Sequence, residues 1–90
     1  MTNIKHQLYN TLNEIITFYN KNGNIHRFYN KLSHNNKLLS QYVSTDIYYN
    51  YKIDLKIVYD EMINGDDYSM IVNDCINSIQ RMMIELLVFE

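Results

Sequence analysis

The chain has 90 residues, of which 47% are hydrophobic and 20% charged, and its formal net charge is −2. This composition excludes a disordered chain, and the length fits one domain. A chain of this size buries only about 60 to 65% of its unfolded surface, so a second copy or another partner would add to a thin stability margin.

The residue types bear on membrane or targeting segments and on the base composition of the gene. The longest apolar stretch, MMIELLVF at 82–89, contains Glu85 and is far shorter than the ~20 residues that span a bilayer. The polar start MTNIKHQLYN does not resemble a signal peptide, so we expect a cytoplasmic protein. Six residue types with AT-rich codons (Phe, Tyr, Met, Ile, Asn and Lys) supply 48 of the 90 residues, which indicates an AT-rich gene.

The first half of the chain predicts two amphipathic helices. Residues 3–20 place apolar side chains at helical spacing, with polar side chains on the other side. Gly23 suits the left-handed position after a helix end, and Asn24 suits the cap of the next helix. The second helix is predicted at 24–43, unless the polar run SHNN at 33–36 breaks it.

The segment 47–59, IYYNYKIDLKIVY, fits both a strand and a helix. A strand of this length would be about twice the usual one, and only the short segment at 38–43 could pair with it. A helix would begin after the capping signal STD at 44–46 and end at Asn64 and Gly65. Length and flanks favour a helix at 46–63, and a hairpin at about 38–59 is the alternative.

The last helix is predicted at 67–88, with Asp66 and Asp67 suited to its start. Its apolar stripe includes Cys75, the single cysteine, which we expect to be buried and structural. The fold prediction is therefore an all-α, small up-down four-helix bundle that forms one domain over residues 1–90.

The helix at 46–63 carries more apolar residues than a bundle needs. Tyr51, Leu55 and others form one face, whereas Tyr49, Ile53 and Ile57 form a separate ridge at i, i+4 and i+8. One apolar stripe suffices in a four-helix bundle, so we expect self-association or a partner to cover the ridge. The alternative is a centrally placed helix in a compact monomer.

No motif for catalysis, metal binding or a cofactor stands out. The sequence has no GxGxxG, P-loop or HExxH pattern, and a single cysteine forms no internal disulfide or cysteine-based zinc site. His6, His26 and His34 lack metal-ligand spacing. Asp54 and Glu61 share a helix face but have no nucleophile or glycine loop beside them. We expect no metal, no cofactor and no enzymatic activity.

Charge is divided between the two halves of the chain. Residues 1–45 hold five basic residues and one acidic residue, whereas residues 46–90 hold three basic and nine acidic residues. Tyrosine is a rigid interface residue, and charge complementarity speeds encounter, so an acidic surface bearing tyrosines suits a basic protein. Attraction between the two halves is the alternative explanation. The residues predicted to bind a partner surround the last turn: Tyr59, Asp60, Glu61, Asp66, Asp67, Tyr68 and Asp74.

These features favour a small protein-binding inhibitor from an AT-rich mobile element, phage or virus. Immunity proteins and anti-defence proteins such as anti-CRISPRs share this size, acidity and origin, and the expected partner is a basic nuclease or nucleic-acid-binding effector. The alternatives are a self-associating structural or adaptor protein, which could be a homodimer, and a nucleic-acid-binding regulator. Scattered cations and the negative net charge argue against direct nucleic-acid binding.

Overall fold

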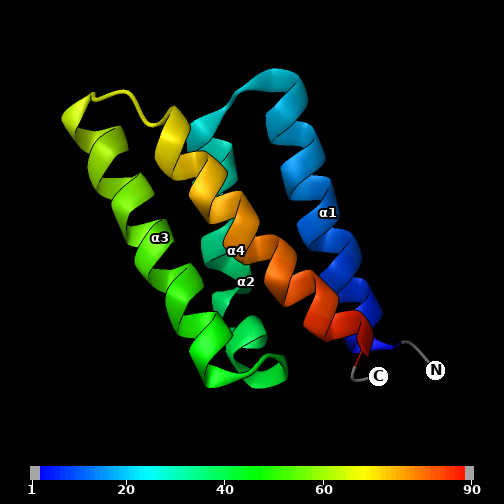
Figure 1. The fold of residues 1–90 in the computed structure, drawn as a ribbon. Helices are drawn as coiled ribbons and strands as arrows, with labels where there is room; N and C mark the ends of the chain where they lie inside the picture. The colour runs from blue at the N-terminus through cyan, green and yellow to red at the C-terminus, as the bar shows by residue number, and fades with distance from the viewer. Residues whose placement is uncertain (1–2, 89–90) are drawn as a thin grey trace.

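Four helices account for most of residues 3–88, the part of the chain that the computed structural model describes (Figure 1). These are α1 (Ile4–Asn22), α2 (Ile25–Tyr42), α3 (Thr45–Asn64) and α4 (Ser69–Val88). Residues 3–88 contain no strand. The all-α prediction is confirmed, the ambiguous segment 47–59 is helical, and the alternative hairpin at about 38–59 is wrong.

The helix boundaries follow from the residues that cap them. The side chains of Asn3 and Asn24 accept hydrogen bonds from backbone N–H groups in the first turns of α1 and α2. Gly23 and Gly65 follow α1 and α3 with positive φ values of 66° and 73°. Because a side chain with a Cβ is strained in this conformation, glycine is the residue that ends both helices at little cost.

The polar run SHNN does not interrupt α2. The Asn35 side chain donates to the Lys31 carbonyl at 2.8 Å, within the same helix. Asn36 accepts a hydrogen bond from the Tyr51 hydroxyl of α3. Since Asn35 and Asn36 have partners compatible with a helix, their side chains do not end the backbone ladder.

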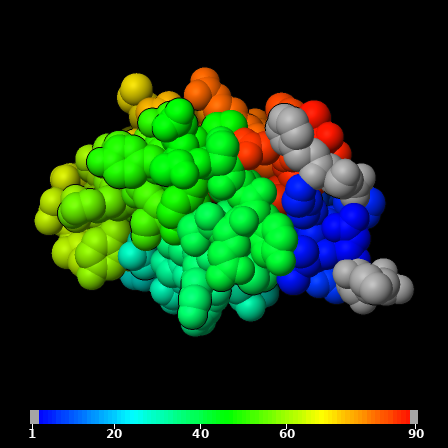
Figure 2. All heavy atoms as spheres, turned by 90° about the horizontal axis from the view of Figure 1, so that it is seen from below, coloured from blue at the N-terminus to red at the C-terminus, as the bar shows by residue number. Residues whose placement is uncertain are grey.

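The helices form an up-down bundle in which α1 packs on α2 and α4, and α3 packs on the same two helices. Seen from the end that carries the α2–α3 turn, the helices follow one another around the bundle in chain order (Figure 2). The α1–α2 and α3–α4 turns both lie at the opposite end (Figure 1). The outward face of α3 is therefore bordered by α2 on one side and by α4 on the other.

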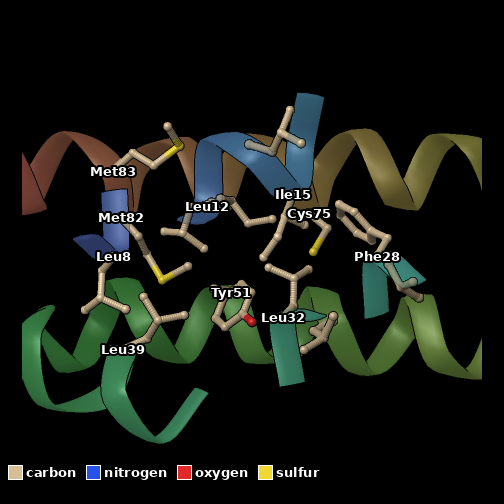
Figure 3. Close-up of a cluster of buried hydrophobic side chains, with 14 of the residues drawn as sticks. Leu8, Leu12, Ile15, Phe28, Leu32, Leu39, Tyr51, Cys75, Met82 and Met83 are labelled. Carbon is tan, nitrogen blue, oxygen red and sulfur yellow. The ribbon is translucent and has the colours of Figure 1, made fainter. Parts of the chain in front are cut away.

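All four helices contribute to one core (Figure 3). Tyr51, whose side chain is fully buried, is the largest residue in it, and its hydroxyl is satisfied by Asn36. At the edge of the core, Glu85 of α4 accepts from both the backbone N–H and the hydroxyl of Ser44, the residue that precedes α3. This contact ties the end of α4 to the start of α3.

Within residues 3–88, no helix combines the length and the apolarity that crossing a membrane requires.

Candidate protein interface

The outward face of α3 carries the predicted ridge. Tyr49, Ile53 and Ile57 leave 64%, 43% and 38% of their surface exposed. Tyr51 and Leu55, on the opposite face, are at most 2% exposed. Single exposed apolar residues are ordinary on proteins, but three in succession along one helix face make a continuous strip of the kind found at contact surfaces.

Two shallow grooves flank this ridge, and Ile53 lines both of them. The groove toward α2 is formed by tyrosine, lysine and aliphatic residues: Tyr29, Tyr49, Lys52, Ile53, Leu55, Lys56 and Tyr59. The groove toward α4 is polar: Asn50, Ile53, Asp54, Asp74, Asn77, Ser78 and Arg81. The two sides of the ridge thus differ in charge, with lysines toward α2 and mainly carboxylates toward α4.

Aromatic packing anchors the groove toward α2. The rings of Tyr29 and Tyr59 lie 5.1 Å apart between centroids, at an interplanar angle of 37°. Lys56 pairs with Asp60 one turn further along α3, with 3.4 Å between Nζ and Oδ2. Both partners of this pair are exposed, so it contributes little to stability and both charges stay accessible to another molecule.

The groove toward α4 is tied together by a hydrogen bond in which the Ser78 hydroxyl donates to Asp54 at 2.5 Å. Cys75 lies beneath it and is fully buried. Burial, and secondly the nearby Asp54 carboxylate, raise the pKa of the Cys75 thiol to about 12. A thiol with this pKa is almost entirely protonated at neutral pH, so Cys75 is a poor nucleophile and fits the structural role that the sequence predicts.

The structure separates the residues predicted to bind a partner into three places. Asp60, Glu61, Asp66 and Asp67 lie together where α3 ends and the chain turns. Asp74 lies further along α4, in the polar groove. The two predicted tyrosines contact other parts of the bundle: Tyr59 packs on Tyr29 of α2, and Tyr68 is partly buried against the core.

The turn itself is held by hydrogen bonds. Asp67 accepts from the backbone N–H of Ser69 at 3.0 Å and from the Ser69 hydroxyl at 2.7 Å. These bonds lower the pKa of the Asp67 carboxyl, so it stays ionised below the usual range. Gly65 donates its N–H to Met62, and the next N–H, from Asp66, bonds the Glu61 carbonyl. The carboxylates are therefore displayed on an ordered turn.

Two apolar side chains at this end were missing from the sequence analysis. Ile63 and Met70 leave 61% and 82% of their surface exposed, before and after the turn. Helical phase is the signal that could have found them, because it places both residues off the buried face. Ile63 is next to the core-packed Met62, and Met70 lies two residues before the buried Val72. We define the acidic end as Asp60, Ile63, Asp66, Asp67 and Met70.

A third hollow lies between α1 and α2 and has a different character. The Arg27 guanidinium stacks over the Phe18 ring, 4.0 Å from its centroid. Phe18 is the least exposed of the large apolar residues on the surface, at 36%. Because a cation already covers this ring, the hollow offers a weaker apolar contact than the ridge of α3.

Within residues 3–88, no three His, Cys, Asp or Glu side chains are grouped so that they could hold a metal ion. His6, His26 and His34 lie exposed on α1 and α2. The chain matches no protein-family model, no curated protein and no solved structure. Its surfaces, and not its relatives, are therefore the basis for a functional proposal.

Proposed function

We propose that this protein is a small inhibitor that docks its acidic end on a basic surface of a nuclease or another nucleic-acid-binding effector. The observation that carries this proposal is that the exposed carboxylates of Asp60, Asp66 and Asp67 lie at or near the α3–α4 turn, in the same stretch of chain as the exposed side chains of Ile63 and Met70. The finer interpretation, an immunity or anti-defence protein of a mobile element, phage or virus, is supported by the AT-rich composition.

Electrostatics supports a basic partner. A cluster of exposed carboxylates attracts a positively charged surface over about a Debye length, roughly 8 to 10 Å at moderate salt, and raises the rate of encounter. The channel that holds phosphates in a nuclease is lined by such positive charges. A protein that presents carboxylates to the channel competes with the nucleic acid without any catalytic step.

Apolar side chains inside the charged end supply the other part of an interface. Contact energy in protein complexes is concentrated in a few desolvated side chains, while the charged rim governs encounter and orientation. Ile63 and Met70 are exposed enough to be buried by a partner. Met side chains also adapt to irregular surfaces, which suits Met70 to such a contact.

The ordered turn favours binding as well. The Gly65 conformation and the Asp67 cap fix the chain between α3 and α4, so docking would cost little conformational entropy. An inhibitor of an intracellular nuclease would act in the cytoplasm, which agrees with the expectation from the polar N-terminal sequence.

Charge reversal at the acidic end tests the proposal. In the variant Asp66→Lys with Met70→Lys, an exposed carboxylate that provides no helix cap and the most exposed apolar side chain of the acidic end become cations. The matched control, Glu14→Lys with Val88→Lys, makes the same change in net charge at exposed sites outside the acidic end. Each tagged protein is used to capture partners from host lysate at low and high salt, and the captured protein is then assayed for nucleic-acid binding or cleavage.

We expect the wild-type protein and the control to capture a basic nucleic-acid-binding protein that elutes as salt rises and whose activity falls on binding. The acidic-end variant should melt normally and lose this capture. Equal capture by the acidic-end variant, or a captured partner whose activity is unchanged, would contradict the proposal.

A further inference from the structure

We propose that the outward ridge of α3 is a homodimer interface at which the second copy packs with its α3 pointing in the same direction. This inference does not depend on the proposed function, because it rests on the outward face of α3 and its two grooves; Asp60 is the one residue that this face shares with the acidic end. In the resulting dimer, both α3–α4 turns lie at one end, and two acidic ends face the same way.

The spacing of the ridge residues suits a symmetric pair of helices. Tyr49, Ile53 and Ile57 form a row at i, i+4 and i+8, the type of row that packs against its counterpart when two helices cross at about −50°. Ile53, at the centre of the row, also lines both flanking grooves. Two copies related by a two-fold axis can therefore each place the row of one α3 beside the groove of the other, as isologous dimers require.

Charge selects the direction of the second copy. Lys52 and Lys56 line the side of the ridge toward α2, whereas Asp54 and Asp74 line the side toward α4, with Arg81 further along α4. A two-fold axis parallel to α3 places the α2 side of one copy opposite the α4 side of the other, so lysines meet carboxylates. A perpendicular axis would place lysines opposite lysines, an arrangement that like-charge repulsion disfavours.

The charges near the two ends of α3 are compatible with a parallel pair. Asp46 and Asp60 lie toward opposite ends of α3, and in a parallel pair each would approach its own counterpart. A crossing of about −50° at Ile53 separates the helix ends and so separates these carboxylates. Asp60 is also paired with Lys56 in its own chain, which reduces its repulsion.

A second copy is preferred to an unrelated protein as the occupant for two reasons. The ridge has an acidic flank and a basic flank in one chain, so the chain itself supplies the complement to each flank. In addition, a 90-residue chain buries a smaller fraction of its surface than a larger domain does, so burial of a second apolar row adds to its stability.

Sedimentation of matched variants tests the interface. Ile53→Glu with Ile57→Glu introduces two charges on the ridge, and Ile84→Glu with Val88→Glu makes equivalent changes on exposed α4 residues. We expect the wild-type protein and the α4 variant to approach twice the monomer mass as concentration rises, and the ridge variant to remain monomeric with normal helicity. Tyr49→Lys, at the most exposed ridge position, should also weaken the dimer if the double variant does not fold.

Spin labels distinguish the two directions. A cysteine introduced at Asn64, at the end of α3, is labelled selectively because the native Cys75 is buried. Thr45→Cys provides a label at the start of the same helix. A parallel dimer gives a shorter distance between two labels at position 64 than between a label at 45 in one copy and a label at 64 in the other.

The reverse order of these distances would overturn the parallel arrangement. A wild-type protein that sediments as a monomer at every concentration, or a ridge variant that dimerises like the wild type, would overturn the interface itself.

Discussion

The two faces of α3 carry the same kinds of residue, but one face is buried and the other is exposed. Tyr51 is fully buried, whereas Tyr49, two residues earlier, leaves 64% of its surface exposed. Leu55 is 2% exposed, whereas Ile53 is 43% exposed. Side-chain type therefore does not separate core from contact surface in this helix. Helical phase does, because only one face of α3 points toward the other three helices.

On the buried face, the polar atom of Tyr51 has a hydrogen-bond partner within the chain. The Tyr51 hydroxyl bonds Asn36, and burial raises the pKa of this phenol. No described residue covers the Tyr49 ring to a comparable extent. The contrast suggests that substitutions at the two tyrosines act on different properties, folding for Tyr51 and association for Tyr49.

The largest expected effect follows from truncating the buried ring. Tyr51→Ala should lower the free energy of unfolding by about 3 to 5 kcal/mol, because it leaves a cavity in the core and an unpaired Asn36. The matched Tyr49→Ala should change the unfolding free energy of the monomer by less than about 0.5 kcal/mol. Urea unfolding at a low protein concentration measures both. Similar losses for the two variants would contradict the assignment of the two faces.

The next effect concerns Cys75, which lies under the groove beside the ridge. Cys75→Ser should cost about 1 to 3 kcal/mol, because a buried hydroxyl loses its hydration. Cys75→Ala is the matched control, since it removes the sulfur without adding a polar group. Partner binding should be the same for the wild type and for Cys75→Ser at temperatures where both are folded. A Cys75→Ser protein that melts normally but no longer binds would show that the thiol has a functional role.

A smaller effect is expected from pH. The Cys75 pKa is raised from 9.0 to about 12 on folding, so the folded state holds this proton more tightly than the unfolded state does. The stability that this gives is fully present below pH 9 and is lost progressively as pH rises toward 12. At pH 10 the loss should be roughly 1 kcal/mol.

Urea unfolding of the wild type and Cys75→Ala at pH 8 and pH 10 isolates this contribution. The wild type should lose more stability than the variant between the two pH values, although Tyr51, whose pKa is raised in the same direction, titrates in both proteins. Equal losses would show that the thiol does not contribute.

Most of the fold could be predicted from sequence because its signals are local. Apolar periodicity gave the four helices, and Gly23 and Gly65 gave two of their ends. The predicted start of the last helix at 67 was two residues early, since Asp67 accepts from the Ser69 N–H and so stands outside α4. The segment 47–59 was ambiguous because its tyrosine and β-branched residues fit both the strand and the helix periodicity, and its length and flanks favoured the helix.

The candidate surfaces could be predicted only in part. The positions of Tyr49, Ile53 and Ile57 followed from phase within one helix. The orientation of Tyr68 depends on the turn before α4, and that of Tyr59 depends on contact with Tyr29 of another helix. Neither contact is encoded by local spacing, so the sequence alone could not place these two side chains, and the exposure of Ile63 and Met70 was missed.

Substitutions on the ridge should change the stability of the monomer least and the association of two copies most. The concentration dependence of the urea unfolding midpoint is the measurement that tests this most directly, because a dimer of folded chains stabilises the folded state by mass action. We predict that the wild-type midpoint rises with protein concentration. For Ile53→Glu with Ile57→Glu, it should stay constant at the value of the dilute wild type. A wild-type midpoint independent of concentration, or a double variant that unfolds at much lower urea, would show that the outward face of α3 is not a dimer interface.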